Sequence, residues 1–173
     1  PETLSLLEDV MDGYLPDLKT LDAEVGRRLF NAPDYPEAAA RAIERMIGAR
    51  PLVIKNGVLV SGVIVRHLAL PGLLRSTEAA LRWFSRHWRD RALLSVMSQY
   101  APVRDAPPSR ALSRREYERI IIWLREFGIE EGYCQDLARD QDWLPDFTRE
   151  NPFPPDFSTP VWHFSAAASG GGT

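Results

Sequence analysis

The 173-residue sequence is poor in cysteine, lysine and histidine, and each shortage excludes a kind of chemistry. Cys134 is the one cysteine, so the chain forms no intrachain disulfide and no four-cysteine metal site. Lys19 and Lys55 are the two lysines, and the net charge is −3, which together argue against nucleic-acid binding. The three histidines do not stand at metal-ligand spacing.

Long apolar runs are also missing. The longest mostly apolar stretches, such as 62–65 and 120–124, are far too short to cross a bilayer. The first residues have neither the basic region nor the apolar segment of a secretory signal peptide. We therefore expect a cytoplasmic protein that does not associate with membranes.

What is present is an alternation of strand and helix patterns. Apolar and β-branched runs predict strands over 11–15, 62–70 and 93–97, and one more short strand within 129–136. Asn56-Gly57 predicts a type I′ hairpin turn within 52–60. Helical periodicity predicts helices over 3–10, 35–47, 76–89 and 113–127. This order predicts an α/β fold with a parallel sheet and crossover helices.

Functional side chains of parallel α/β folds gather where strands end. Three segments stand at such ends, namely 17–19, 66–72 and 98–100. Asp17 and Lys19 fall on one side of an extended chain, so we expect them to converge with Arg66 of the next parallel strand. His67 then faces the opposite side and packs beneath a helix.

Five strings in these regions resemble one protein family. They are Tyr14-Leu-Pro-Asp-Leu-Lys19, Asn31-Ala-Pro-Asp-Tyr35, Val65-Arg-His-Leu-Ala-Leu-Pro-Gly72, Met97-Ser-Gln-Tyr-Ala-Pro-Val103 and Gly132-Tyr-Cys-Gln-Asp136. Their order resembles radical S-adenosylmethionine (SAM) proteins related to the pyruvate formate-lyase-activating enzyme. The resemblance implies that residues 1–136 form the second half of a partial (β/α)6, TIM-like barrel. Residues 137–173 would then be an irregular carboxy-terminal tail.

The resemblance also implies cofactors, SAM and a [4Fe–4S] cluster, for a full-length relative that cleaves SAM reductively. The family's Cys-x3-Cys-x2-Cys motif and its Gly-Gly-Glu segment are absent here. Since three thiolates hold such a cluster, we expect neither cofactor to bind tightly to this chain alone. We expect the chain by itself to be inactive.

The family implies roles for five residues at the barrel mouth. Asp17 would help to organise a cation near SAM, Lys19 would meet the SAM carboxylate, and Arg66 would point toward SAM or toward Asp17. Gln99 or Tyr100 would contact the adenosine, where better-known relatives use a histidine. The structural alternatives are a solvated ion pair for Asp17 and Lys19, a cross-barrel ion pair for Arg66, and loop hydrogen bonding for the last two.

The expected partners are a glycyl-radical enzyme or another protein substrate. The missing half-barrel, or a second copy of the chain, would cover the exposed strand edge. Two other functions stay open. One is a non-catalytic interaction module that kept the half-barrel, and the other is an aldolase-like enzyme that uses Lys19 as a Schiff-base amine.

Overall fold

The computed structural model describes residues 2–102 and 107–137, so the predicted tail lies almost wholly outside the described part. Helices and strands alternate along these residues, as the sequence pattern predicted. The helices are α1 (Glu2–Leu7), α2 (Ala23–Phe30), α3 (Tyr35–Ala49), α4 (Leu74–His87) and α5 (Arg114–Glu126). The strands are β1 (Gly13–Tyr14), β2 (Val53–Lys55), β3 (Val58–Leu68), β4 (Leu93–Met97) and β5 (Gly132–Cys134).

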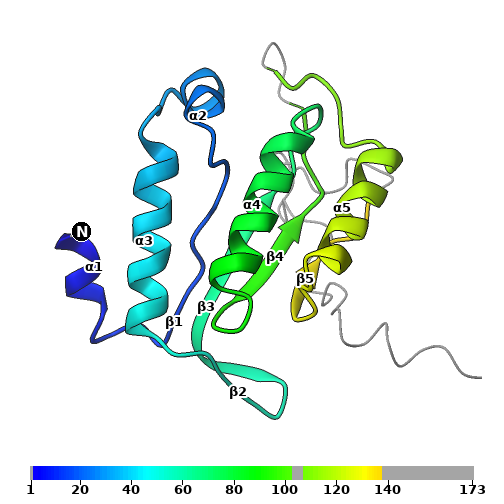
Figure 1. Cartoon of the computed structure of the whole chain (residues 1–173). Coiled ribbons are helices and arrows are strands. Elements are labelled where there is room, and N and C mark those ends of the chain that lie inside the picture. The colour runs from blue at the N-terminus through cyan, green and yellow to red at the C-terminus, as the bar shows by residue number, and fades with distance from the viewer. Residues whose placement is uncertain (1, 103–106, 138–173) are drawn as a thin grey trace, which may run out of the picture.

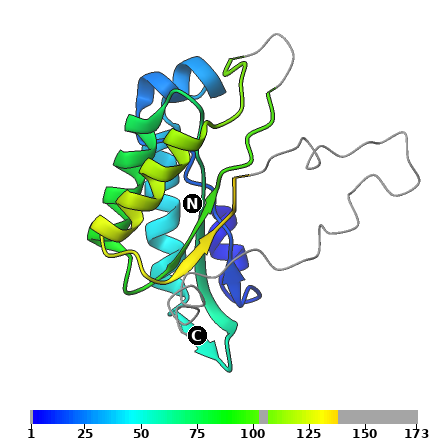
Figure 2. The ribbon, with the colours of Figure 1, turned by 90° about the vertical axis from the view of Figure 1, so that its right-hand side faces the viewer.

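The strands form one sheet with the order β1-β3-β4-β5, and β2 is added to β3 by a hairpin (Figure 1). All neighbours in this order are parallel, and β2 is antiparallel to β3. The helices α3, α4 and α5 lie on one face of the sheet (Figure 2). The prediction of an α/β fold with parallel βα units is confirmed.

The core lies between the sheet and this helix layer. Along β3, Val63, Val65 and His67 are almost fully buried, whereas Ile64 and Arg66 between them are half-buried. Side chains of a strand alternate between the two faces, so the buried set points at the helices. The helices contribute the buried side chains Leu81, Phe84, Ile120 and Leu124 to the same core.

Two local sequence signals act as predicted. Asn56 and Gly57 both have positive φ angles, +52° and +77°, as a type I′ turn requires. Ser113 caps α5: its hydroxyl accepts from the Glu116 N–H, and the Glu116 side chain accepts from the Ser113 N–H. The hairpin and the start of α5 are therefore encoded locally.

The helix α2 is an element that the periodicity did not predict. Its N-cap is Asp22, whose carboxylate accepts from the N–H groups of Glu24 and Val25. Gly26 lies inside the helix, and a Cβ there would come within 2.6 Å of the Ala32 carbonyl oxygen. This glycine permits the close turn from α2 into α3, although glycine weakens a helical pattern in the sequence.

The first edge strand is shorter than predicted, since β1 covers two residues rather than 11–15. The short strand expected within 129–136 is β5, which covers three residues. Pairing with β3 nevertheless continues past β1, since Arg66 N–H donates to the Pro16 carbonyl and Leu18 N–H donates to the Arg66 carbonyl, each at 2.8 Å. Among the described residues, no helix is long and apolar enough to span a membrane.

Candidate functional site

Four polar side chains stand in one row across the sheet. Asp17 is the register partner of Arg66, Arg66 of Ser95, and Ser95 of Tyr133. Register partners on neighbouring strands lie about 4.8 Å apart and point to the same face. We call these residues the polar row. It lies on the face of the sheet opposite to α3, α4 and α5, because its neighbours in sequence face those helices.

The polar row is bordered by apolar residues. Ile64 pairs with Leu93 on one side of it, and Leu68 pairs with Met97 on the other. The row is therefore a polar stripe on a mostly apolar, partly exposed surface. Sequence reasoning found its first two members but missed Ser95 and Tyr133. The alternation of β4 and β5 indicates the face of these side chains but not their register with Arg66.

Asp17 and Arg66 form the charged end of the polar row. Arg66 Nη2 lies 2.8 Å from Asp17 Oδ1, and the two side chains are 41% and 36% exposed. The pairing of Arg66 with Asp17 that the family pattern allowed is therefore present. The Arg66 Nε atom is buried and has no hydrogen-bond partner among the described residues, and the Asp17 Oδ1 contact is close without hydrogen-bond direction. The guanidinium is held by charge but keeps donor capacity.

His67, the next residue, fixes this strand from the helix side. Its Nδ1 lies 2.6 Å from the Leu18 carbonyl oxygen and its Nε2 lies 3.1 Å from the Thr77 hydroxyl of α4. A carbonyl only accepts, so Nδ1 carries the proton, and the neutral ring then accepts from Thr77 at Nε2. Burial lowers the pKa of His67, which favours this neutral form. The prediction that His67 packs beneath a helix is confirmed.

Tyr35 hydrogen-bonds to the backbone of the segment that carries Asp17, on the side away from β3. Its hydroxyl donates to the Asp17 carbonyl at 2.7 Å and accepts from the Lys19 N–H at 3.0 Å. One side chain thus satisfies two backbone groups that a neighbouring strand would otherwise pair. Burial raises the pKa of Tyr35, so the hydroxyl stays protonated and able to donate.

Lys19 lies at the same end of the sheet, but it contacts other residues than Asp17 and Arg66 do. Its side chain is exposed, and its Nζ lies 5.5 Å from the centroid of the Phe30 ring of α2. In the described part of the chain it forms no ion pair, whereas Asp17 pairs with Arg66. Three residues were expected to converge. Asp17 and Arg66 are in direct contact, whereas the Lys19 ammonium lies over the Phe30 ring.

Gln99 and Tyr100 follow the end of β4, as predicted. Both are half-buried, and the Tyr100 hydroxyl donates to the Pro108 carbonyl at 2.9 Å. The neighbouring Ser98 is buried and its hydroxyl lies 3.0 Å from the Gln135 carbonyl oxygen and 2.9 Å from that of Asp136. These bonds order the loops at the carboxyl ends of β4 and β5.

Glu116 joins two loops at this end of the sheet. Its carboxylate accepts from the Gly72 N–H at 2.7 Å, from two Arg110 nitrogens at 2.6 and 2.8 Å, and from Ser113. Arg110 and these hydrogen bonds hold the pKa of Glu116 well below its usual range. The loop after β3 is thereby fixed to the start of α5.

The residues described here do not fit an iron–sulfur cluster or another metal centre. Cys134 is fully buried, and its pairing with Val96 places it on the helix-covered face. Burial raises the pKa of its thiol to about 12, which disfavours the thiolate that metals bind. No group of three or more histidine, cysteine, aspartate or glutamate side chains in the described ranges could hold an ion.

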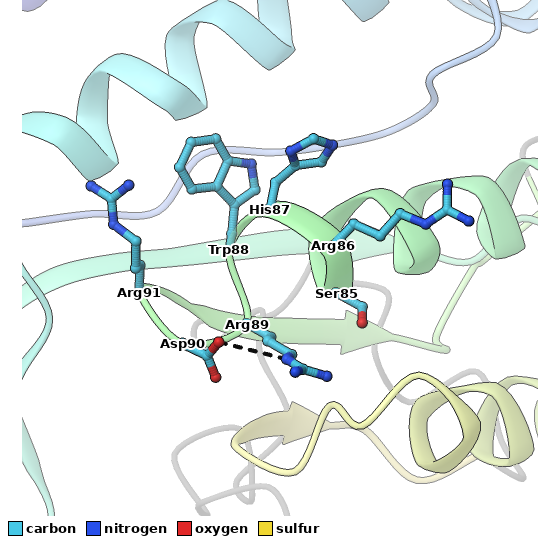
Figure 3. A pocket seen from close by; sticks show the side chains of 7 residues that line it. All are labelled: Ser85, Arg86, His87, Trp88, Arg89, Asp90 and Arg91. Atoms are coloured by element: carbon cyan, nitrogen blue, oxygen red, sulfur yellow. Dashed lines mark ion pairs between the residues drawn. The ribbon is translucent and has the colours of Figure 1, made fainter.

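A cavity of about 340 Å³ lies at the turn from α4 into β4, lined by residues 85–91. Figure 3 shows that its arginines do not converge: Arg91 points to one side of the turn, while Arg86 and Arg89 point to the other, and Arg89 lies near Asp90. The Arg91 guanidinium lies 5.5 Å from the Trp88 ring centroid. The turn precedes β4, so the cavity lies at the end of that strand opposite to its carboxyl end. The polar row is the better-built candidate site.

Comparisons with known proteins give one distant relative. The chain is 33% identical over 141 residues to the uncharacterized protein MJ0674 of Methanocaldococcus jannaschii. The match covers 80% of this chain and 37% of the archaeal protein, so the chain spans little more than a third of the length of that relative. No protein-family model and no solved structure matches the chain.

Proposed function

We propose that this chain is the carboxy-terminal part of a radical SAM protein of the pyruvate formate-lyase-activating-enzyme-related family. It would supply the last three βα units of a partial (β/α)6 barrel and the SAM and substrate side of its lumen. The polar row carries this proposal, because Asp17 and Arg66 come from the two strings of the family resemblance and meet in one ion pair.

The chemistry of the polar row suits a zwitterionic ligand with a polar body. The Arg66 side chain is partly exposed, and a guanidinium binds carboxylates in a planar, directional way. Asp17 balances one positive charge and holds the guanidinium in place. Ser95 and Tyr133 add hydroxyl groups further along the row, between apolar rows that would contact an adenine ring or a deoxyribose.

The cluster would have to come from elsewhere, since one buried cysteine cannot replace three thiolates. We propose that the protein carrying this chain supplies the Cys-x3-Cys-x2-Cys motif in another segment. A half-barrel also leaves the face with the polar row open, and the missing half, or a second copy, would cover it. A glycyl-radical enzyme or another protein would be the substrate of the whole enzyme.

One alternative function is not favoured by the side-chain positions. A Schiff-base lysine is activated by desolvation or by a neighbouring cation. Lys19 is exposed and lies on the Phe30 ring. The non-catalytic interaction module needs the same half-barrel, and it differs from our proposal only in whether SAM binds.

Anaerobic reconstitution with iron and sulfide tests the proposal. We expect this chain alone to bind no cluster and the whole gene product to bind one [4Fe–4S] cluster. After addition of a strong reductant, the whole product should convert SAM to 5′-deoxyadenosine and methionine. A whole product that binds the cluster but leaves SAM intact, or one that binds no cluster, would contradict the assignment.

A further inference from the structure

The helices α4 and α5 lie side by side in Figure 1, and both are rich in arginine. Residues 74–91 hold five arginines against two carboxylates. Residues 114–126 hold four arginines against three carboxylates, one of which, Glu116, is buried. The whole chain has a net charge of −3, so the residues outside this positive region are acidic on balance.

The arginines of this region are mostly without carboxylate partners. On α2 and α3, by contrast, Arg27 pairs with Glu24 and Arg41 pairs with Glu37. On α4 and the turn after it, Arg82 pairs with Glu78 at 2.7 Å, and Arg89 has a weak contact of 3.6 Å with Asp90. Six more exposed arginines of these two helices form no ion pair with any described residue. They are Arg75, Arg86, Arg114, Arg115, Arg119 and Arg125.

Spacing places these side chains on one continuous surface. On α4, Arg75, Arg82 and Arg86 follow each other at helical spacing, with the small, exposed Ala79 among them. The Arg82 guanidinium lies 4.5 Å from the centroid of the Phe127 ring at the end of α5, so it spans the two helices.

On α5, exposed positions hold Arg115, Arg119 and Arg125. With the α4 residues Arg75, Arg82, Arg86 and Arg89 they form what we call the arginine surface. Ile122 lies at the centre of its α5 half and is 43% exposed. Arg119 and Arg125 stand three residues before and after it, on the same side of the helix. Glu118 and Glu126 stand four residues before and after Ile122 on this same side, so charges of both signs surround the apolar side chain. Arginines nevertheless outnumber carboxylates along α4 and α5, so the arginine surface as a whole is positive around a partly exposed apolar side chain.

We propose that the arginine surface docks an acidic protein segment, which places an apolar side chain on Ile122 and carboxylates on the surrounding guanidinium groups. Arginine binds carboxylates through two parallel hydrogen bonds, and Arg119 is already positioned near the Trp123 ring, at 5.9 Å. A nucleic acid is the less favoured ligand, because phosphates make no use of Ile122 and the chain as a whole is acidic. This inference does not depend on the proposed function.

Fluorescence anisotropy with the full chain and a labelled peptide of repeated Glu-Glu-Leu-Glu tests the proposal. We expect saturable binding that weakens with salt, because exposed charges are screened. The triple variant Arg86→Glu/Arg119→Glu/Arg125→Glu should bind about tenfold or more weakly. Ile122→Ser should also weaken binding of this peptide, but should not change the weaker binding of a Glu-Glu-Ser-Glu repeat.

A variant with the same change of charge serves as the control. Arg27→Glu/Arg28→Glu/Arg41→Glu alters exposed arginines on α2 and α3 and should retain wild-type affinity. Circular dichroism establishes that each variant is folded before its affinity is compared. Equal losses in the two triple variants, absence of peptide binding at low salt, or tighter binding of a single-stranded RNA of equal charge would each overturn the proposal.

Discussion

Arg66 and His67 are neighbours in sequence, but their side chains lie on opposite faces of the sheet and make different contacts. Arg66 pairs with Asp17 in the polar row, while His67 is buried between Leu18 and Thr77. Alternation in β3 was enough to predict this division from the sequence. It was not enough to predict the position of Lys19, because that side chain is set by the Phe30 ring of α2, an element whose pattern Gly26 weakens.

Burial of a neutral His67 predicts a loss of stability in mild acid. The pKa of His67 is lowered in the folded state, so the unfolded state binds the proton more readily. The stabilising contribution is present above the unfolded pKa, about 6.5, and declines as the pH falls below it. Urea unfolding between about pH 7.5 and 5.5 should show this decline. It should be absent in His67→Gln, which starts less stable, and retained in His87→Gln at an exposed histidine.

Two glycines test how helices pack in this fold. Gly26→Ala places a Cβ 2.6 Å from the Ala32 carbonyl oxygen, so α2 and its turn must shift and the protein should lose stability. Gly48 in α3 has no atom within 4 Å of its virtual Cβ, and Gly48→Ala should stabilise by about 0.5–1 kcal/mol through helix propensity. The melting temperatures of the two variants, compared with the wild type in thermal unfolding, test these opposite effects. Equal effects of the two substitutions would show that the close approach in α2 has no energetic consequence.

Glu116 provides a second test at the level of elements, because it connects the loop after β3 to α5. Glu116→Gln should cost about 1.5–3 kcal/mol of unfolding free energy, the range for hydrogen bonds to charged groups. The pKa of Glu116 is lowered in the folded state. Its stabilising contribution is therefore fully present at pH values above the ordinary glutamate pKa, and it is lost as the pH falls through and below that value. Glu118→Gln on the exposed side of α5 is the control, and a comparable loss there would contradict this role for Glu116.

The alternation of βα units was predictable for the whole molecule, and so was the placement of Asp17 and Arg66 at neighbouring strands. Ser95 and Tyr133 were not identified, because their contribution depends on strand register, which a single sequence does not fix between β3, β4 and β5. The arginine surface likewise depends on α4 and α5 lying side by side. The polar row and the arginine surface lie on opposite sides of the sheet. Each depends on elements that the parallel βα arrangement brings side by side.

The central claim is that the polar row binds SAM in the whole protein. Calorimetric titration of SAM into the cluster-loaded gene product, as wild type and as Arg66→Ala, tests it most directly. Loss of a charge-assisted contact of about 1.5–3 kcal/mol predicts affinity at least about tenfold weaker in Arg66→Ala. Lys19→Ala should have an effect of similar size if its ammonium turns from Phe30 to the ligand, and Arg82→Ala on α4 should have none. Unchanged SAM affinity in Arg66→Ala, in a folded and cluster-loaded protein, would contradict the account.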